Sequence, residues 1–368
     1  MSKPHGIIIL GANGSGKSTL GRELAYVLNF AHFDAEDYYW YKTDMPFTVA
    51  RSYKERQEML ISDIEKHGSF VMSGDISNWG EQFLQLFNLA VFLTVPTDIR
   101  IERIERREFK RFGDRIRKGG EMYEQHLGFI KFAASRSIPL LEQWASEYSC
   151  PVLRVDGTKM PEEIVKEILT YINTRNHYDA LIDENNDPVH DPAPLKAHMD
   201  KWDGEAFIEA LQLSPDKSVL EIGVGTGRLA VHVCAKCGCF TGIDISPKTV
   251  ERAKVNLQEY AKADLICGDF LTYPFSGRFD IIYSSLTFMH IKDKQTAIQR
   301  TASLLNLDGR FVLSIDKNQH REIDYGNRRI VVYPDTPEDI STMLTQAGLT
   351  IEKQFETEFA VIFTARKC

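Results

Sequence analysis

The stretch Gly11–Thr19 reads GANGSGKST and contains the pattern G-x-x-x-x-G-K-S. It directly follows the apolar run Ile7–Leu10 and directly precedes the helix-like sequence LGRELAYVL. A glycine loop between a strand and a helix turns backbone N–H groups and a helix N-terminus toward one point, where they can hold a polyphosphate. In such a loop Lys17 reaches the outer phosphates and the Ser18 hydroxyl binds Mg²⁺. The stretch therefore predicts a nucleoside triphosphate site. Its expected contacts are Gly11, Asn13, Gly14, Ser15, Gly16, Lys17, Ser18 and Thr19.

The first half of the chain alternates short apolar runs with longer amphipathic ones. This pattern predicts a parallel sheet flanked by helices. The expected strands are Gly6–Leu10, Ala31–Asp34, Ser69–Ser73, Ala90–Val95 and Val152–Val155. The expected helices are Lys17–Leu28, Ala50–His67, Thr97–Lys110, Met122–Glu147 and Pro161–Thr174.

Polar residues follow the expected strands at the edge where ligands of open α/β sheets bind. Asp34 ends the second strand, and Asp75 comes shortly after the third. A carboxylate opposite a phosphate loop can hold Mg²⁺ or orient an acceptor hydroxyl. The alternative is that these acids cap helices or lie in solvent. Asp34 is the preferred candidate for a metal-binding and catalytic role because it stands directly at a strand end.

A basic cluster follows the fourth strand, with nine basic and four acidic residues between Arg100 and Lys118. Guanidinium groups on a closing flap can neutralise a phosphoryl group in transfer. The same cluster could instead be a solvated helix face with i,i+4 ion pairs, or a surface that holds RNA.

Four of these motifs resemble small P-loop kinases of the adenylate kinase and shikimate or gluconate kinase type, over about residues 1–175. They are Gly11–Ser18, the DAEDYYW segment from Asp34, the SGD at residues 73–75 and the RRE-x-x-RFG-x-R-x-x-x-GG at residues 106–120. The resemblance implies ATP as phosphoryl donor, Mg²⁺ and a hydroxyl-bearing or nucleoside-like acceptor. It implies catalytic roles for Lys17, Asp34 and Arg107 and lid contacts to ATP from Arg103 and Arg111. The aromatic residues Tyr38, Tyr39, Trp40 and Trp79 either stack on an acceptor or pack in the core.

A second glycine turn, VLEIGVGTGR at residues 219–228, has the pattern E-x-G-x-G-x-G. Arg228 stands where a dinucleotide fingerprint requires its last glycine, so a nicotinamide cofactor is disfavoured. The turn suits a zwitterionic ligand without phosphates, whose amino group Glu221 would accept. Asp244, which ends the expected strand Phe240–Asp244, is placed to accept both ribose hydroxyls. Asp269 is placed for an adenine amino group, and the Phe270 ring for the adenine face.

These motifs, with FDIIYSS at residues 279–285 and LNLDGRF at residues 305–311, resemble the class I S-adenosylmethionine-dependent methyltransferases over about residues 178–368. The resemblance implies a seven-stranded Rossmann-like sheet whose last strand, from the region Thr350–Thr364, is antiparallel. It also implies a set of contacts to S-adenosylmethionine. These contacts are Tyr178, Glu221, Gly223, Gly225, Gly227, Asp244, Ile245, Asp269, Phe270, Ser284 and Ser285.

His290 follows the fourth strand of this second sheet, near the expected position of the methyl group. It could act as a catalytic base that removes a proton from the acceptor, or it could be a packed residue at a helix start. Tyr178 resembles the tyrosine that closes over the cofactor in related enzymes.

The length of 368 residues favours two domains. We expect residues 1–175 to form a P-loop domain and residues 176–368 a methyltransferase domain, each a three-layer αβα unit. Residues 173–194 are rich in Asn, Asp and Pro and predict a linker, and a helix is expected at Pro194–Leu211. No apolar run approaches the roughly 18 residues of a membrane span. Six unevenly spaced cysteines suit reduced thiols and a cytoplasmic location.

Together these patterns predict a bifunctional enzyme, a small-molecule kinase fused to a methyltransferase that acts on a small molecule. One alternative is a methyltransferase regulated by a P-loop unit that only senses nucleotide. Another is an RNA-modifying methyltransferase whose basic cluster binds nucleic acid, although nucleic acid and membrane are both disfavoured as partners. The acceptors and the oligomeric state are left open.

Overall fold

The computed structural model describes residues 5–145, 147–148 and 150–368. Its contacts divide the chain into two compact units, Met1–Leu169 and Thr170–Cys368. The division falls inside a helix, a few residues before the boundary that the sequence predicts. Among the described residues, no helix is both long enough and apolar enough to cross a membrane.

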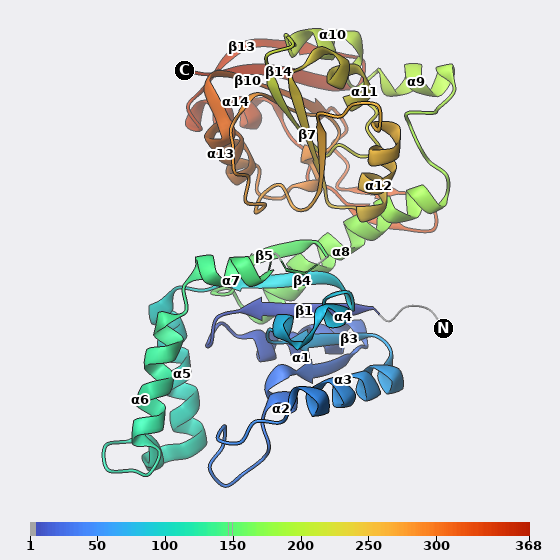
Figure 1. Ribbon diagram of the computed structural model, residues 1–368. Coiled ribbons are helices and arrows are strands. Elements are labelled where there is room, and N and C mark those ends of the chain that lie inside the picture. The colour runs from blue at the N-terminus through green and yellow to red at the C-terminus, as the bar shows by residue number, and fades with distance from the viewer. Residues whose placement is uncertain (1–4, 146, 149) are drawn as a thin grey trace. The chain divides into compact units, whose positions relative to one another are not determined.

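The first unit contains a five-stranded parallel sheet in the order β2-β3-β1-β4-β5 (Figure 1). Its strands are β1 (Gly6–Gly11), β2 (Ala31–Asp34), β3 (Phe70–Ser73), β4 (Phe87–Thr94) and β5 (Val152–Asp156). Its helices are α1 (Lys17–Leu28), α2 (Ala35–Tyr39), α3 (Tyr53–His67), α4 (Glu81–Leu84), α5 (Thr97–Phe112), α6 (Tyr123–Ser135), α7 (Ile138–Ala145) and the first part of α8 (Pro161–Asp183). Two short 3₁₀ helices are η1 (Ser77–Trp79) and η2 (Gly113–Ile116).

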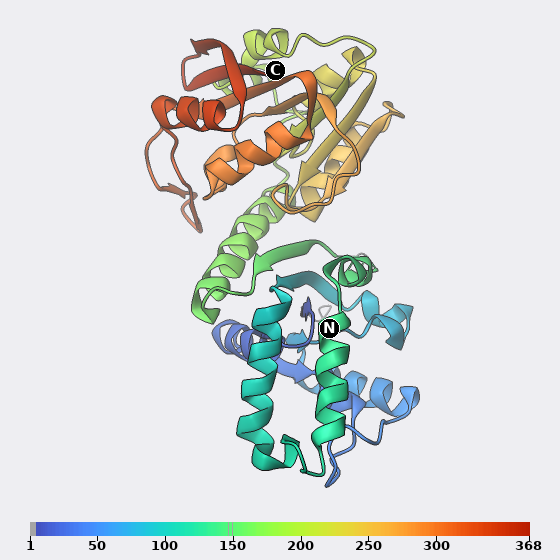
Figure 2. The same ribbon diagram turned by 90° about the vertical axis from the view of Figure 1, so that its left-hand side faces the viewer.

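Alternate residues of β1 face opposite layers of this unit. Ile8 and Leu10 belong to a core formed with α3, α4 and α7, whereas Ile7 and Ile9 are buried on the other face. A strand that is apolar on both faces must be covered on both faces, so the layers are helix, sheet and helix. Figure 2 shows α5 and α6 running side by side as a hairpin in this unit.

The second unit contains a seven-stranded sheet in the order β13-β14-β10-β9-β6-β7-β8. Its strands are β6 (Ser218–Ile222), β7 (Cys239–Asp244), β8 (Ala263–Cys267), β9 (Phe279–Ser284), β10 (Leu305–Asp316), β13 (Leu349–Glu356) and β14 (Ala360–Lys367). A separate hairpin pairs β11 (Glu322–Asp324) with β12 (Arg329–Val331). The helices are α9 (Ala193–Met199), α10 (Gly204–Ala210), α11 (Ala230–Val233), η3 (Cys234–Lys236), α12 (Pro247–Asn256), η4 (Phe288–His290), α13 (Lys294–Leu304) and α14 (Pro337–Gln346).

β14 is the one antiparallel strand of the seven-stranded sheet, since it runs opposite to both β10 and β13. The core on one face is formed with α13 and α14, and the core on the other with α10, α11 and α12. The fold class predicted from the sequence is therefore confirmed. The region Thr350–Thr364 holds most of two strands, of which only the second is antiparallel.

Three predicted elements differ in the structure. The helix expected at Met122–Glu147, which includes residue 146 outside the described residues, is two helices that break at Arg136. The break frees backbone carbonyls, and the buried Arg100 guanidinium donates to two of them, Ala133 O at 3.0 Å and Arg136 O at 3.2 Å. A charged side chain reaching from α5 thus satisfies the groups that a continuous helix would have paired internally.

The expected linker and the helix after it were also wrong in part. Helix α8 continues to Asp183, well into the segment predicted to be irregular. The helix expected at Pro194–Leu211 is divided into α9 and α10, because Asp203 caps α10 and Gly204 adopts a φ of +66°. Asn and Asp favour loops because their side chains can pair with the nearby backbone. In α8, however, Asp179 and Asp183 pair with Ser246 and Lys248 of another element.

Candidate functional site

The glycine loop of the first unit connects β1 to α1. Helix α1 begins without a side-chain cap, and Gly16 precedes it with a φ of +100°. A side chain added at Gly16 would meet only the Arg103 guanidinium, at 3.9 Å, so the loop is open on this side. Uncapped N–H groups at the start of a twelve-residue helix form a site for an anion. The Ser15 hydroxyl is buried and has no hydrogen-bond partner among the described residues.

Lys17 lies back on its own loop, where its Nζ donates to Gly11 O and Ala12 O, each at 3.0 Å. Burial lowers the pKa of Lys17, while the carboxylates of Glu36, Asp34 and Asp75 act to raise it. The structure therefore brings three acids and the predicted phosphate lysine together.

The three acids differ in how they are held. Asp34 caps α2 by accepting from Glu36 N at 3.1 Å, so the helix-capping alternative is observed for it. Asp75 accepts from Tyr148 Oη at 2.9 Å and from Ser77. Burial and the neighbouring Asp34 raise the pKa of Glu36, against the charges of the nearby arginines. Glu36 was not among the predicted site residues, because only the first acid after a strand can be placed from the sequence.

The basic cluster divides into internal and open groups. Arg100 is almost fully buried, and besides α6 it donates to Asn13 O of the glycine loop at 3.2 Å. Arg103 donates to Ser15 O at 3.3 Å and to Gly157 O at 3.0 Å. Both arginines therefore brace the loop's backbone.

Arg107 and Arg111 lie further along α5 and are less enclosed. Arg107 pairs with Glu108, and its charge also acts on Lys17 and Glu36. The Arg111 guanidinium lies 5.7 Å from the Phe47 ring. Of the predicted lid residues, Arg107 and Arg111 both act on Glu36, and Arg107 also acts on Lys17.

The aromatic residues after β2 were expected either to stack on an acceptor or to pack in the core. Tyr38 and Trp79 are buried in the core, with 4% and 2% of their surface exposed. Tyr39 packs against the Arg56 guanidinium at 3.7 Å. Trp40 is half-buried and contacts the Phe47 ring. Core packing is thus the outcome for Tyr38 and Trp79.

The glycine turn of the second unit follows β6. A side chain at Gly223 would collide with Thr287, whereas a side chain at Gly225 would meet nothing within 4 Å. Gly225 has a φ of +53°, and its N–H donates to Asp244 Oδ2 at 3.0 Å. Gly227, with a φ of +96°, closes the turn. The turn therefore packs against the chain at one glycine and opens to free space at another.

Asp244 stands at the end of β7 beside this turn. Its Oδ1 accepts from Ser246 N at 2.9 Å and from Thr249 Oγ1 at 3.2 Å. Burial raises the pKa of Asp244 despite these donors. The carbonyl of the next residue, Ile245, lies 3.8 Å from the Cys267 thiol. The carboxylate is thus held in one orientation beside the turn.

Glu221 is 3% exposed and accepts from Tyr283 Oη at 2.7 Å. Burial raises its pKa to about 8. Burial makes ionisation of this carboxyl group unfavourable, and the Tyr283 hydrogen bond offsets only part of that cost. A cation bound beside Glu221 would favour the ionised form.

Four further predicted contacts are already engaged inside the protein. The Ser284 hydroxyl donates to Ile222 O at 3.0 Å, and the Ser285 hydroxyl donates to Asp203 Oδ2 at 2.8 Å. The Phe270 ring is 5% exposed and belongs to the core, while Asp269 accepts from Leu271 N at 3.0 Å. For the two serines, therefore, the backbone is what remains for a ligand.

Asp203 is a residue that the sequence did not reveal. Its carboxylate is almost fully buried and receives Arg228 at 3.0 Å as well as Ser285. In the sequence Arg228 matters because it disfavours a dinucleotide fingerprint. In the structure it pairs with Asp203, which accepts from Ser285 in the loop after β9. The spacing of 25 residues between the two carries no local signal.

Tyr178 and His290 meet, with the Tyr178 hydroxyl 2.6 Å from His290 Nε2. Burial and the neighbouring His177 lower the pKa of His290 to about 4, so the ring is neutral near pH 7. Its Nδ1 is buried without a hydrogen-bond partner among the described residues. Two residues chosen separately from the sequence thus form one pair.

In comparisons with known proteins, the two halves of the chain match different families. A family described as an AAA domain matches residues 7–118, and one described as a methyltransferase domain matches residues 219–309. The uncharacterized protein YqaC of Bacillus subtilis is 38% identical over 176 residues, which are 46% of this chain and 97% of YqaC. An uncharacterized methyltransferase of Anoxybacillus flavithermus is 30% identical over 175 residues, which are 45% of this chain and 81% of that protein.

Among solved structures, magnesium protoporphyrin IX methyltransferase (ChlM) of Synechocystis PCC 6803 with bound SAM is 20% identical. The match covers 54% of this chain and 97% of the ChlM chain, with a TM-score of 0.45. N-methyltransferase NodS of Bradyrhizobium japonicum WM9 is 19% identical over 53% of this chain and 98% of that chain, with a TM-score of 0.41.

The fold and the two glycine loops define a two-unit α/β protein with a P-loop unit and a Rossmann-like unit. By these relationships the chain belongs both to the family of YqaC and to the methyltransferase family of the Anoxybacillus protein.

Proposed function

We propose that the second unit transfers the methyl group of S-adenosylmethionine to a small molecule. The geometry of the glycine turn supports this cofactor. Gly225 faces open space, and Asp244 beside it is fixed to accept hydroxyl groups. A carboxylate at this strand end suits the hydroxyl groups of a ribose. Arg228, which stands where a dinucleotide fingerprint requires its last glycine, disfavours a pyrophosphate and so favours a phosphate-free adenosine. Bound there, the cofactor supplies a methyl group that its sulfonium already activates.

In this proposal the residues of the chain hold and align. Glu221 would accept the cofactor's ammonium group, and the bound cofactor would supply its methyl group to the acceptor. His290 with a pKa near 4 is a weak base, so it suits an acceptor that ionises readily or attacks with a neutral lone pair. Tyr178 orients that ring through Nε2.

We propose further that the first unit is a kinase that uses ATP and Mg²⁺. One observation carries this proposal: three carboxylates, Asp34, Glu36 and Asp75, act on Lys17 together with Arg107. A unit that only senses nucleotide needs contacts to phosphate, and negatively charged carboxylates beside the phosphates would weaken its binding. Acids suit a bound cation and an acceptor hydroxyl instead.

In the reaction the acceptor oxygen attacks the γ-phosphorus and the bond to the β–γ bridging oxygen breaks. ADP leaves, and the acceptor proton passes to a carboxylate or to water. Ser18 and an acid of the trio would hold Mg²⁺, and Arg107 would neutralise charge on the moving group. The acceptor is a small molecule, because two of the cluster's arginines, Arg100 and Arg103, already brace the protein. The free thiols fit work in the cytoplasm.

The test is transfer of label from γ-labelled ATP to small molecules of a metabolite extract, run in parallel with a labelled methyl donor. Wild-type protein is expected to label one product in each arm. Glu36→Gln and Asp34→Ala should lose phosphoryl transfer and keep methyl transfer.

The opposite result would favour the sensor. If the wild type binds ATP without labelling any product, and if ATP changes methyl transfer, the first unit is regulatory. Steeply salt-dependent RNA binding that Arg107→Ala and Arg111→Ala abolish would favour the nucleic-acid alternative.

A further inference from the structure

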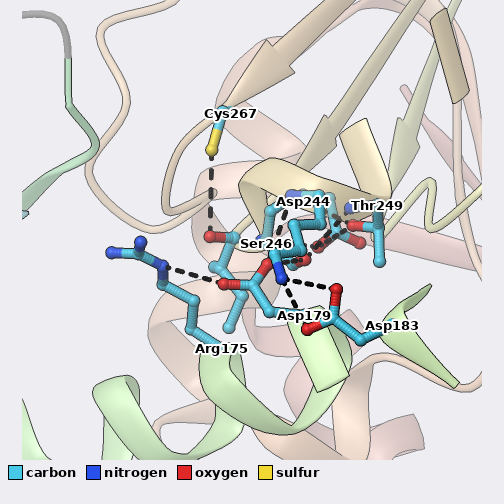
Figure 3. A network of polar contacts seen from close by, with 9 residues as sticks. Arg175, Asp179, Asp183, Asp244, Ser246, Thr249 and Cys267 are labelled. Atoms are coloured by element: carbon cyan, nitrogen blue, oxygen red, sulfur yellow. Dashed lines mark hydrogen bonds and ion pairs between the residues drawn. The ribbon is translucent and has the colours of Figure 1, made fainter. Parts of the chain in front are cut away.

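Residues 170–190 precede the first strand of the second unit and contact α12 near both of its ends. Near the start of α12, Asp179 Oδ1 accepts from Ser246 Oγ at 2.7 Å and from Lys248 N at 3.2 Å. Asp179 Oδ2 lies 3.7 Å from Arg175 Nε on the same helix (Figure 3). The carboxylate thus sits at the N-terminus of α12, where negative charge is stabilised.

Ser246 connects Asp179 to the predicted ribose acid. Its side chain is fully buried and caps α12 by accepting from Thr249 N at 3.1 Å. Its backbone N–H donates to Asp244 Oδ1, and Thr249 Oγ1 donates to the same oxygen. Asp179 accepts from the hydroxyl of Ser246 and Asp244 accepts from the backbone N–H of the same residue, so Ser246 links the two carboxylates (Figure 3).

Asp187 plays the corresponding part near the other end of α12. It is 6% exposed and accepts from Asn256 Nδ2 at 3.2 Å and from Arg252 at 3.1 Å. The Asn256 amide also donates to Thr226 O, inside the glycine turn, at 2.9 Å. Asp187 therefore fixes the side-chain amide of Asn256, which in turn is hydrogen-bonded to the glycine turn at Thr226.

We propose that Asp179 and Asp187 are positioning residues for the cofactor, Asp179 acting through Ser246 on Asp244 and Asp187 acting through Asn256 on the glycine turn. Neither residue belongs to the glycine, strand-end or loop motifs of the second unit. This inference rests on the proposed binding of S-adenosylmethionine.

Asp183 is the matched control. It lies on α8 one turn beyond Asp179, and within the part of the chain that the structure describes it pairs only with the Nζ of Lys248, at 2.6 Å. More than half of its side chain is exposed. An exposed ion pair of this kind contributes little. Asp183→Asn removes the same charge from the same helix without touching Ser246.

The experiment is calorimetric binding of S-adenosylhomocysteine and of 5′-methylthioadenosine, which lacks the amino-acid part, to the full chain. Asp179→Asn should weaken both ligands about tenfold, because it acts at the ribose. Asp187→Asn should weaken S-adenosylhomocysteine about tenfold and methylthioadenosine clearly less, because it acts through the turn beside Glu221. Asp183→Asn should stay within about twofold for both.

A double variant separates positioning from general destabilisation. In an Asp244→Ala background, Asp179→Asn should cost almost nothing further, because its target is gone. Should Asp179→Asn fail to fold, Ser246→Ala removes the same link and should show the same coupling.

Additive losses in the double variant, or an equal loss in Asp183→Asn, would overturn the positioning role. Loss of the same factor for both ligands in Asp187→Asn would overturn its assignment to the turn. Failure of the wild type to bind S-adenosylhomocysteine would overturn the proposed function itself.

Discussion

The two glycine loops of this chain end comparable strands and are built for opposite charges. The loop of the first unit leads into an uncapped helix and carries Lys17, with Arg103 and Arg107 at hand. The turn of the second unit gives the N–H of Gly225 to a carboxylate of its own chain and has Glu221 behind it. Glycine makes both loops possible, and the side chains around them decide what binds.

The largest effect is expected for Lys17→Ala. Loss of a cation aimed at the transferring phosphoryl group should lower ATP turnover by about 10²–10³-fold, measured as ADP release. Binding of S-adenosylhomocysteine should not change, because the second loop needs no such cation. Lys66→Ala, an exposed lysine at the end of α3, is the control. Unchanged turnover in Lys17→Ala would contradict the kinase.

Asp244→Ala is expected to weaken S-adenosylhomocysteine about a hundredfold in calorimetry, since two hydrogen bonds to a charged group are lost. ATP turnover should stay as in the wild type. Asp264→Ala, an exposed acid on the neighbouring strand β8, gives the baseline. If the two variants bound S-adenosylhomocysteine with equal affinity, the proposed contact between Asp244 and the ribose would be refuted.

Low pH should reduce the folding stability of the second unit, because two of its histidines are buried. Burial lowers the pKa of His177 and of His290 to about 4, below the usual 6.5. Arg328 adds to this effect at His177, and His177 and Lys294 add to it at His290. Because the unfolded chain binds protons first, stability is full above pH 6.5 and falls as the pH drops toward 4. The slope is up to about 1.4 kcal/mol per pH unit for each ring.

Amide hydrogen exchange of β9 and β10 between pH 7.5 and 4.5 measures this loss. His290→Asn should flatten the profile, and the exposed His232→Asn should not. An unaltered profile in His290→Asn would show that the ring is not the titrating group.

The smallest effect concerns Glu221. With a pKa of about 8 it is mostly protonated at pH 7, and a bound ammonium group favours its charged form. Binding of S-adenosylhomocysteine at pH 7 should therefore release close to one proton, and affinity should rise as the pH approaches 8. Calorimetry in two buffers of different ionisation enthalpy measures the release. Glu221→Gln should abolish it, and a wild type without buffer dependence would refute the contact.

The sequence predicted those features that depend on local spacing. Strand β2 and helix α1 have the expected bounds, and the order of glycine turn and strand-end acids was enough to predict the fold of the second unit. Tyr178 and His290 were each selected, although their meeting across 112 residues was not foreseeable.

What the sequence missed depends on pairing between distant residues. Arg103 is occupied with backbone carbonyls. Asp203 is a buried acid whose charge Arg228, Ser285 and the Gly204 N–H stabilise. The break at Arg136 and the extension of α8 have the same cause, since partners from other elements outweigh local propensity. Such pairings leave no periodic trace in one sequence.

The helical approach to the second unit has a practical meaning for anyone who cuts the gene. A shortened chain that began at residue 219, where the family match starts, would keep the glycines of the second unit's turn and the acids that end its strands. It would lack Tyr178, Asp179 and Asp187, and with them the supports of His290, Ser246 and Asn256. The natural place to begin an isolated methyltransferase is within α8, before Thr170.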